Sequence, residues 1–320
     1  MAYVGLQHQI KTNRRKSILL LMAFPLLVLA MVFFITLILT YNPEDPNSFN
    51  LAMEYFIGAI PMTLLIVGIW FVIAYFGNTA MINSAANSHS ISRKENMRIY
   101  NLTENLCMSV GMKMPQLRVI ESSALNAFAS GINDKTYTVT LTTGIIDALT
   151  DDELEGVIAH ELMHIRNHDV RLLIVSIIFV GIFSFIMQIA VRSLFYNNAF
   201  SSRRNNNDKG GGAILIIAVI VVAAIAYFLS FLFKLALSRK REYMADSGAV
   251  EMTRNADGLA RALEKISGRS NVEEVTSDDV KQMFIENDPR EQSKGFLGGL
   301  GGLFSTHPPI EKRIQFLRQL

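Results

Sequence analysis

Four long apolar runs restrict what this chain of 320 residues can fold into. They cover residues 18–39, 56–76, 172–191 and 213–233 and contain no charged side chain. Each run has the roughly 20 residues that an α-helix needs to cross a hydrocarbon core of about 30 Å. The sequence therefore predicts a mainly α integral membrane protein whose four spans form two transmembrane hairpins.

The first run is expected to be a retained anchor. Half of the residues are hydrophobic and only 18% are charged, whereas a soluble domain carries about 25% charged residues. Basic residues precede the first run, as they do in a secretory signal peptide. However, the run is longer than the apolar part of a signal peptide, and no small-residue cleavage site follows it.

The distribution of Lys and Arg predicts the orientation in the membrane. Four basic residues lie within residues 11–16, the loop 41–55 carries only acidic charges, and three basic residues follow within residues 93–98. Basic loops stay on the cytoplasmic side. We therefore expect a multi-pass protein of the cell membrane with its N-terminus, and the chain after about residue 78, in the cytoplasm.

The second hairpin fits this rule less well. Its loop, residues 192–212, contains four basic residues and one acidic residue, which is the wrong sign for an exterior loop. Either the first hairpin fixes the topology and this loop is carried across, or the third and fourth runs do not fully cross. We favour a crossing hairpin because the first helix usually dominates the orientation.

A short motif between the two hairpins indicates metal chemistry. Residues 160–164 read His-Glu-Leu-Met-His. Two histidines four apart on a helix lie on one face, so His160 and His164 can bind a single metal ion. Glu161 between them can take a proton from a metal-bound water. The motif is typical of metal-dependent hydrolases, but because it is short, the surrounding sequence has to support it.

The local sequence predicts that this motif lies on a helix. Thr150 followed by Glu153 is a capping box, so we expect a helix from about Asp151. His168 continues the four-residue spacing, but eight residues of helix separate it from His160 by about 12 Å. One ion cannot bridge that distance, so we expect His168 to be a helix-end residue and the third ligand to come from elsewhere.

That third ligand is expected just after the fourth apolar run. Glu242 and Asp246 are four residues apart and face the same way on a helix. A glutamate that completes two histidines gives a ligand set typical of catalytic zinc, with the fourth position open. Asp246 can then accept a hydrogen bond from the second ring nitrogen of a ligating histidine. The second membrane hairpin, which lies between the two histidines and Glu242, returns the chain to the membrane surface that it left.

The remaining sequence predicts a domain with both helices and strands. Segments 117–121 and 137–141 are rich in Val, Thr and aromatic residues, which is typical of strands. We expect the first hairpin to cover residues 1–80 and the second hairpin residues 171–237. The catalytic domain is expected in two parts, residues 81–170 and 238–320.

The charge and cysteine content exclude two other classes. The net charge is +2 and the chain has one cysteine, Cys107. We find no stripe of basic and aromatic residues, so we expect no nucleic-acid partner. A single cysteine rules out an intramolecular disulfide and any cysteine-based zinc site.

Together these residues resemble the HtpX-type membrane metalloproteases, which are bacterial and archaeal relatives of the CAAX prenyl proteases. The resemblance extends from the first apolar run to the C-terminus. The motifs that carry it are residues 160–164, Glu242 with Asp246, the segment Asn126-Ala127-Phe128-Ala129-Ser130-Gly131, and Thr306-His307-Pro308-Pro309 with Arg313.

The resemblance implies a cytoplasmic α+β zinc protease domain of the gluzincin type. The activity would be that of a zinc endopeptidase with one Zn²⁺, acting on membrane or misfolded proteins at the cytoplasmic face in quality control and stress response. By this resemblance His160, His164 and Glu242 would hold zinc and Glu161 would be the general base. The expected partners are polypeptide substrates and the lipid bilayer.

Three features of the resemblance are left open by the sequence. His307 would either donate to the oxyanion of the tetrahedral intermediate or only shape a loop with its prolines. Arg313 would either steady that loop or pair with Asp246. The segment 126–131 would be an edge strand that pairs with substrate or a core strand that packs Phe128.

The sequence is less consistent with three other functions. A CAAX-type protease for prenylated peptides shares the same metal chemistry but has more spans. A transport protein needs charged residues within its spans, and these runs have none. A non-proteolytic membrane scaffold is disfavoured because all expected ligands and the base are present.

Overall fold

The computed structural model divides the chain into two compact units. It describes residues 6–40, 45–171, 173–174, 220–221, 224–225, 239–275, 278–281, 283–286 and 308–320. One unit comprises Ser17–Ala74 and Val175–Lys234, and the other comprises Met1–Lys16, Tyr75–Ile174 and Leu235–Leu320. The expected third and fourth spans fall almost entirely outside the described residues.

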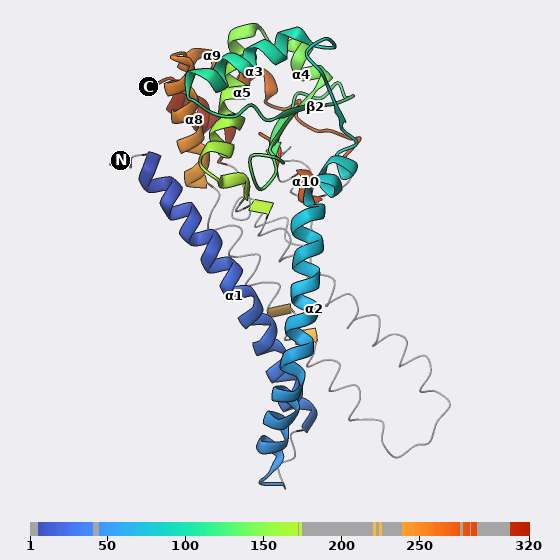
Figure 1. Ribbon diagram of the computed structural model, residues 1–320. Helices are drawn as coiled ribbons and strands as arrows, with labels where there is room; N and C mark the ends of the chain where they lie inside the picture. Colours follow the sequence, from blue (N-terminus) through green and yellow to red (C-terminus); the bar gives the residue numbers. More distant parts are fainter. Residues whose placement is uncertain are drawn as a thin grey trace. The chain divides into compact units, whose positions relative to one another are not determined.

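Two long helices provide most of the described residues of the first of these units (Figure 1). α1 runs over Leu6–Thr40 and α2 over Ser48–Ala85, so the first two apolar runs lie within continuous helices. By length and composition, the stretch Ser48–Ile73 of α2 is apolar enough to cross a membrane, and α1 contains a shorter apolar stretch, Pro25–Ile38. Phe33 of α1 and Phe56 of α2 meet edge to face, with ring centroids 5.3 Å apart.

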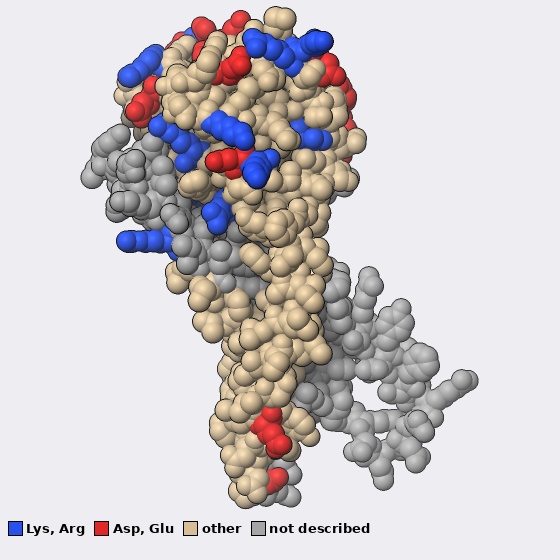
Figure 2. Space-filling view, in the orientation of Figure 1, with Lys and Arg blue, Asp and Glu red and all other residues tan. Residues whose placement is uncertain are grey.

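The surface of these helices is apolar. Many large side chains of α2 are exposed, among them Leu65, Trp70 and Ile73. Figure 2 shows a long uncharged stretch on the described surface of α1 and α2, whereas charged side chains gather on the residues of the other unit. Monomeric soluble proteins rarely expose an apolar surface of this extent, so this surface suits contact with lipid.

The second unit contains a sheet that the described residues form from four strands. These are β1 (His89–Ser90), β2 (Gln116–Ile120), β3 (Ala127–Ser130) and β4 (Thr138–Thr142), in the order β1-β2-β4-β3. β2 and β4 are parallel, and the other pairs are antiparallel. The two strands expected at 117–121 and 137–141 are therefore present, each displaced by one residue.

β3 combines the two roles that the sequence left open. It is the last strand of the described sheet, beside β4. It is also a core strand, because Phe128 is fully buried and its ring lies 5.5 Å from that of Phe284. On the outer side, the Ile285 N–H donates to the Ala127 carbonyl at 2.9 Å, so the start of this edge is already paired.

One helix of the second unit contacts several of its other elements (Figure 1). This helix, α5 (Asp151–Arg166), contacts β3 and three other helices. Those are α3 (Met97–Ser109), α8 (Arg239–Thr253) and α9 (Ala256–Ile266). Shorter helices are α4 (Thr143–Ala148), α10 (Asp278–Lys281) and α13 (Ile310–Leu317).

α5 begins at the expected residue and for the expected reason. The Thr150 N–H donates to Glu153 Oε2 at 2.9 Å, which is the backbone half of a capping box. Glu153 is buried and also accepts a hydrogen bond from Lys265 of α9 at 2.6 Å. The helix start is thus tied to its neighbour α9.

Two glycines allow other helices to approach α5 closely. A Cβ at Gly248 of α8 would overlap the side chain of Met163. In the sequence, Met163 lies between the two histidines of the motif. A Cβ at Gly156 of α5 would lie 3.0 Å from the Leu259 Cα of α9. Because Gly156 has no side chain, α9 can pack close to α5, and because Gly248 has none, α8 can bring its own residues within reach of the α5 histidines.

Candidate active site

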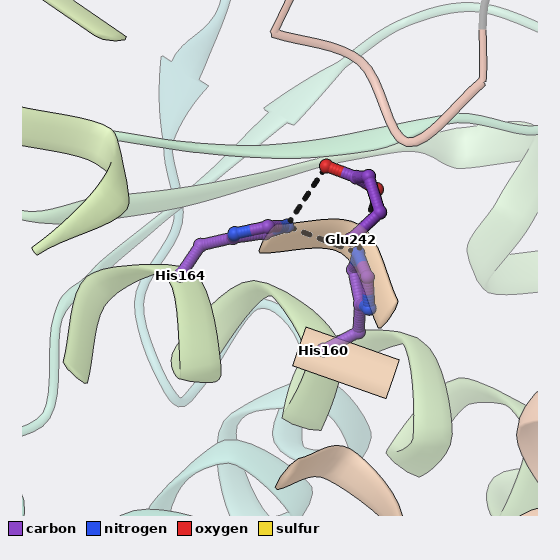
Figure 3. Close-up of side chains that lie close together, drawn as sticks. All are labelled: His160, His164 and Glu242. Atoms are coloured by element: carbon purple, nitrogen blue, oxygen red, sulfur yellow. Dashed lines mark hydrogen bonds and ion pairs between the residues drawn. The ribbon is translucent and has the colours of Figure 1, made fainter. Parts of the chain in front are cut away.

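His160, His164 and Glu242 converge at the contact between α5 and α8 (Figure 3). The two histidine Nε2 atoms are 3.1 Å apart. His164 Nε2 lies 3.5 Å from Glu242 Oε1, and His160 Nε2 lies 3.6 Å from Glu242 Oε2. His160 and Glu242 are buried, whereas 14% of the His164 side chain is exposed.

This geometry suits a tetrahedral metal ion. The three residues can each offer one ligand atom, with all three atoms within 4.8 Å of one another. Zinc bound at about 2.1 Å to tetrahedral ligands holds neighbouring donor atoms about 3.4 Å apart. The two Nε2 atoms are 3.1 Å apart, close to that value, and each faces a different oxygen of the Glu242 carboxylate, at 3.5 Å for His164 and 3.6 Å for His160. The donor set, two imidazoles and one carboxylate, is also one that zinc favours.

Asp246 lies one helical turn after Glu242 and contacts His160. Its Oδ1 is 2.9 Å from His160 Nδ1, and both side chains are fully buried. Because a carboxylate only accepts hydrogen bonds, Nδ1 carries the proton and Nε2 presents its lone pair to the cluster. Burial alone would raise the pKa of Asp246, but the charge of Arg313 and the bond from His160 hold it below its usual range.

Arg313 of α13 pairs with Asp246, one of the two roles considered for it. Its Nε and Nη2 donate to the two Asp246 oxygens at 3.0 and 2.7 Å. Its Nη1 donates to the Ile285 carbonyl at 3.1 Å and lies 3.4 Å from Glu242 Oε2. Arg313 is 1% exposed, so its charge is balanced by carboxylates and not by water.

Glu161 is buried beside this cluster. Burial is the largest influence on it and raises the pKa of its carboxyl group, while the charges of His160 and His164 oppose that rise. No hydrogen bond reaches the Glu161 carboxylate from the residues that the structure describes. A buried carboxylate with a raised pKa is suited to accept and release a proton near neutral pH.

His168 does not join the metal cluster. α5 ends at Arg166, and His168 follows in the left-handed backbone region with φ 58°. Its Nδ1 lies 3.2 Å from the Tyr137 hydroxyl group. The expectation that His168 is a helix-end residue is thus confirmed. However, α5 ends before residue 168, so the distance expected along a continuous helix does not apply.

One residue of the site, Asp169, was not expected from the sequence, and one expected residue, His307, cannot be placed. Asp169 Oδ2 lies 3.2 Å from His164 Nδ1, and Asp169 is buried. The only signal in the sequence was an acidic residue five positions after His164, which a regular helix would not bring near that histidine. His307 lies outside the described residues.

Comparisons with known proteins show the family of this chain. The model of peptidase family M48 matches residues 93–320. A protease HtpX homologue of Bacteroides fragilis is 54% identical over the full length of both chains. A protease HtpX homologue of Streptococcus pyogenes is 33% identical and covers 98% of this chain and 100% of its own length.

A crystal structure of the S. mikatae protein Ste24p is also similar. It is 19% identical, with a TM-score of 0.47, and the match covers 97% of this chain and 66% of that one. The family match and the two full-length relatives decide the classification: the chain belongs to peptidase family M48 and is an HtpX-type metalloprotease.

Proposed function

We propose that this chain is a membrane-anchored zinc endopeptidase that cleaves membrane or misfolded proteins at the cytoplasmic face, in quality control and stress response. The observation that supports this most directly is the convergence of His160, His164 and Glu242 beside the buried Glu161. Membership of a metallopeptidase family supports polypeptide substrates. The cellular role and the choice of substrates rest on resemblance to the HtpX type.

In this proposal His160, His164 and Glu242 hold the zinc ion. Bound there, zinc polarises the scissile carbonyl and lowers the pKa of water to about 7. The Glu161 carboxylate takes a proton from the attacking water and passes it to the leaving amine nitrogen. Asp246 keeps the proton of His160 on Nδ1, so that Nε2 remains a ligand. His307 donates a hydrogen bond to the developing oxyanion.

We further propose that substrates bind in extended form along the outer edge of β3. Alternate residues of a strand direct their N–H and C=O groups to the same side. Because the Ala127 carbonyl faces outward to Ile285, the Ala129 groups also face outward, while Phe128 pairs with Thr140 of β4. Ala129 is then the position for main-chain pairing, a mode that tolerates many substrate sequences.

The topology belongs to the same proposal. The first hairpin, with spans at about 18–39 and 56–76, precedes the protease domain. The second hairpin, with spans at about 172–191 and 213–233, separates the two segments, 81–170 and 238–320, that together form this cytoplasmic domain. Support comes from the long apolar helix α2 and from the distribution of basic residues.

The decisive experiment compares cleavage of casein and of an unfolded membrane protein by the wild type and by Glu161→Gln. The variant should retain zinc and lose activity, because glutamine cannot accept the proton. Glu155→Gln, on the same helix and outside the cluster, is the matched control and should remain active. Unchanged cleavage by zinc-loaded Glu161→Gln would reject the mechanism.

A second comparison separates the proposal from a CAAX-type protease. Purified enzyme is offered a peptide with a prenylated C-terminal cysteine and the same peptide without the lipid. We expect no preference for the prenylated form. Cleavage restricted to the prenylated peptide would favour the CAAX-type alternative.

A further inference from the structure

The two histidines of the cluster have matching surroundings. Each directs Nε2 to the shared centre, where the two atoms are 3.1 Å apart. Each also places Nδ1 beside a buried carboxylate, at 2.9 Å from Asp246 for His160 and at 3.2 Å from Asp169 for His164. Asp246 lies on the helix that carries Glu242, but Asp169 lies on neither helix and has no role in the proposed reaction.

The end of α5 explains how Asp169 reaches His164. On a continuing helix, a residue five positions later would lie about 140° around the axis and would face away. Here α5 ends at Arg166, and His168 takes a left-handed conformation with φ 58°. This turn brings Asp169 back beside the His164 ring, where it is only 4% exposed.

Asp169 also contacts the start of α8. Arg241 Nη1 donates to the Asp169 carbonyl oxygen at 3.4 Å and lies 4.0 Å from Asp169 Oδ1. Arg241 is itself buried and immediately precedes Glu242. Asp169 therefore connects His164 to the start of α8, the helix that carries Glu242.

We propose that Asp169 is a positioning residue for the metal centre. Its carboxylate holds the proton of His164 on Nδ1 and fixes the ring, so that Nε2 faces the other two donors. The same carboxylate lies 4.0 Å from Arg241 and so helps to hold the first turn of α8, and with it Glu242, at ligand distance. The role rests on the proposed metal-binding function of the cluster, and Asp169 itself touches neither substrate nor metal.

The test measures zinc affinity separately from activity. Full-length wild type, Asp169→Ala and Asp169→Asn are compared in detergent by competition with a chromogenic chelator. Partners of ligating histidines typically contribute 10- to 100-fold in metal affinity, so Asp169→Ala should bind zinc about 10 to 100 times more weakly. Asp169→Asn retains an oxygen acceptor and should lose much less. The absorption spectrum of the Co²⁺-loaded Asp169→Ala protein should differ from that of the wild type.

A matched control and a kinetic measurement complete the design. Asp257→Ala removes an exposed aspartate that pairs with Arg261 on α9 and should leave zinc affinity unchanged. With saturating zinc, Asp169→Ala should lower kcat more than it changes KM, because the substrate-binding strand is untouched. If Asp169→Ala does not fold, the isosteric Asp169→Asn still provides the zinc affinity and the Co²⁺ spectrum.

Two results would overturn the inference. Wild-type zinc affinity and an unchanged Co²⁺ spectrum in a folded Asp169→Ala protein would remove Asp169 from the site. If that variant does not fold, a loss of zinc affinity of 100-fold or more in Asp169→Asn would contradict the acceptor role. These outcomes differ from failure of the proposed function, in which the wild type itself binds no zinc or Glu161→Gln still cleaves.

Discussion

Arg313 and Asp246 form a buried two-point ion pair, with Nε and Nη2 of the arginine 3.0 and 2.7 Å from the two carboxylate oxygens. The residues are 67 positions apart. The pair connects α13 to the helix that supplies Glu242. The same guanidinium group binds the Ile285 carbonyl beside β3. One side chain thus contacts both the metal cluster and the segment that pairs with the start of β3.

Arg313→Ala should therefore be strongly destabilising. Removal of one partner leaves a buried charge without compensation, which typically costs about 3–5 kcal/mol. Arg313→Lys should lose less, although it cannot reproduce the two-point contact. Urea unfolding of the detergent-solubilised protein measures both. The exposed Arg318, which pairs with Glu264, provides the control, and Arg318→Ala should change little. Equal effects of Arg313→Ala and Arg318→Ala would contradict the prediction.

Glu242→Ala should remove zinc from the purified protein. The two histidines alone offer only two ligands, whereas catalytic zinc requires three protein ligands. Metal analysis after dialysis should find less than one tenth of the wild-type content. Glu251→Ala, which changes an exposed glutamate of the same helix, should keep it. Full zinc retention by Glu242→Ala would exclude Glu242 from the ligand set.

Gly248→Ala should weaken the contact between α5 and α8. The added methyl group would overlap Cε, the end of the flexible Met163 side chain, so the cost should lie near the lower end of the roughly 1–3 kcal/mol that overpacking usually costs. Because Met163 lies between the two histidines, zinc affinity should fall as well. Gly77→Ala is the comparison, since the closest atom to its new Cβ would be Met81 Sδ at 3.8 Å. Thermal unfolding and chelator titration of both variants test this; equal stabilities would show that Met163 moves aside freely.

Glu153→Gln should reduce stability in a pH-dependent way. Burial raises the pKa of Glu153, but the bonds from Lys265 and Thr150 outweigh it and keep the pKa below its ordinary value of 4.5. A lowered folded-state pKa contributes stability above pH 4.5 that is lost as the pH falls through the folded pKa. The variant should be about 1 kcal/mol less stable at pH 7, and the difference should shrink below pH 4.5. A difference that stayed constant down to pH 3 would exclude the charge as its cause.

The proposed topology can be tested by labelling single cysteines. The native Cys107 is buried, and burial raises the pKa of its thiol to about 11, so its background reaction should be slow. In a Cys107→Ala background, Asn47→Cys should react with a membrane-impermeant maleimide from outside the cell, whereas Arg15→Cys should not. Asn206→Cys in the loop 192–212 distinguishes a crossing second hairpin, which labels from outside, from one that does not cross.

Local signals in the sequence were sufficient for α5 and for much of the candidate site. The Thr150–Glu153 capping box marks the start of α5 within the sequence itself, because its two residues are three positions apart. Likewise, the four-residue spacing of His160 and His164, and of Glu242 and Asp246, places each pair on one helix face. These features depend on helix geometry alone.

Features that depend on the tertiary structure could not be predicted. The contact of Asp169 with His164 requires a left-handed residue at position 168, which the helical pattern does not indicate. Which of its two expected roles Arg313 takes is decided by where α13 packs. The pairing of Ile285 with Ala127 joins segments more than 150 residues apart. The roles assigned to His307 and to the last two apolar runs remain predictions.

The order of the site residues along the chain has a consequence for biosynthesis. The glutamate that completes the donor set is translated 78 residues after His164 (242 − 164). Arg313 is translated 149 residues after His164 (313 − 164). At about 5–20 residues per second, the ribosome needs roughly 4 to 16 s to add the 78 residues that end at Glu242. During that interval the nascent chain carries two histidines without their carboxylate ligand. A growing polypeptide therefore cannot cleave itself or its neighbours before the segment between the two catalytic parts has been synthesised.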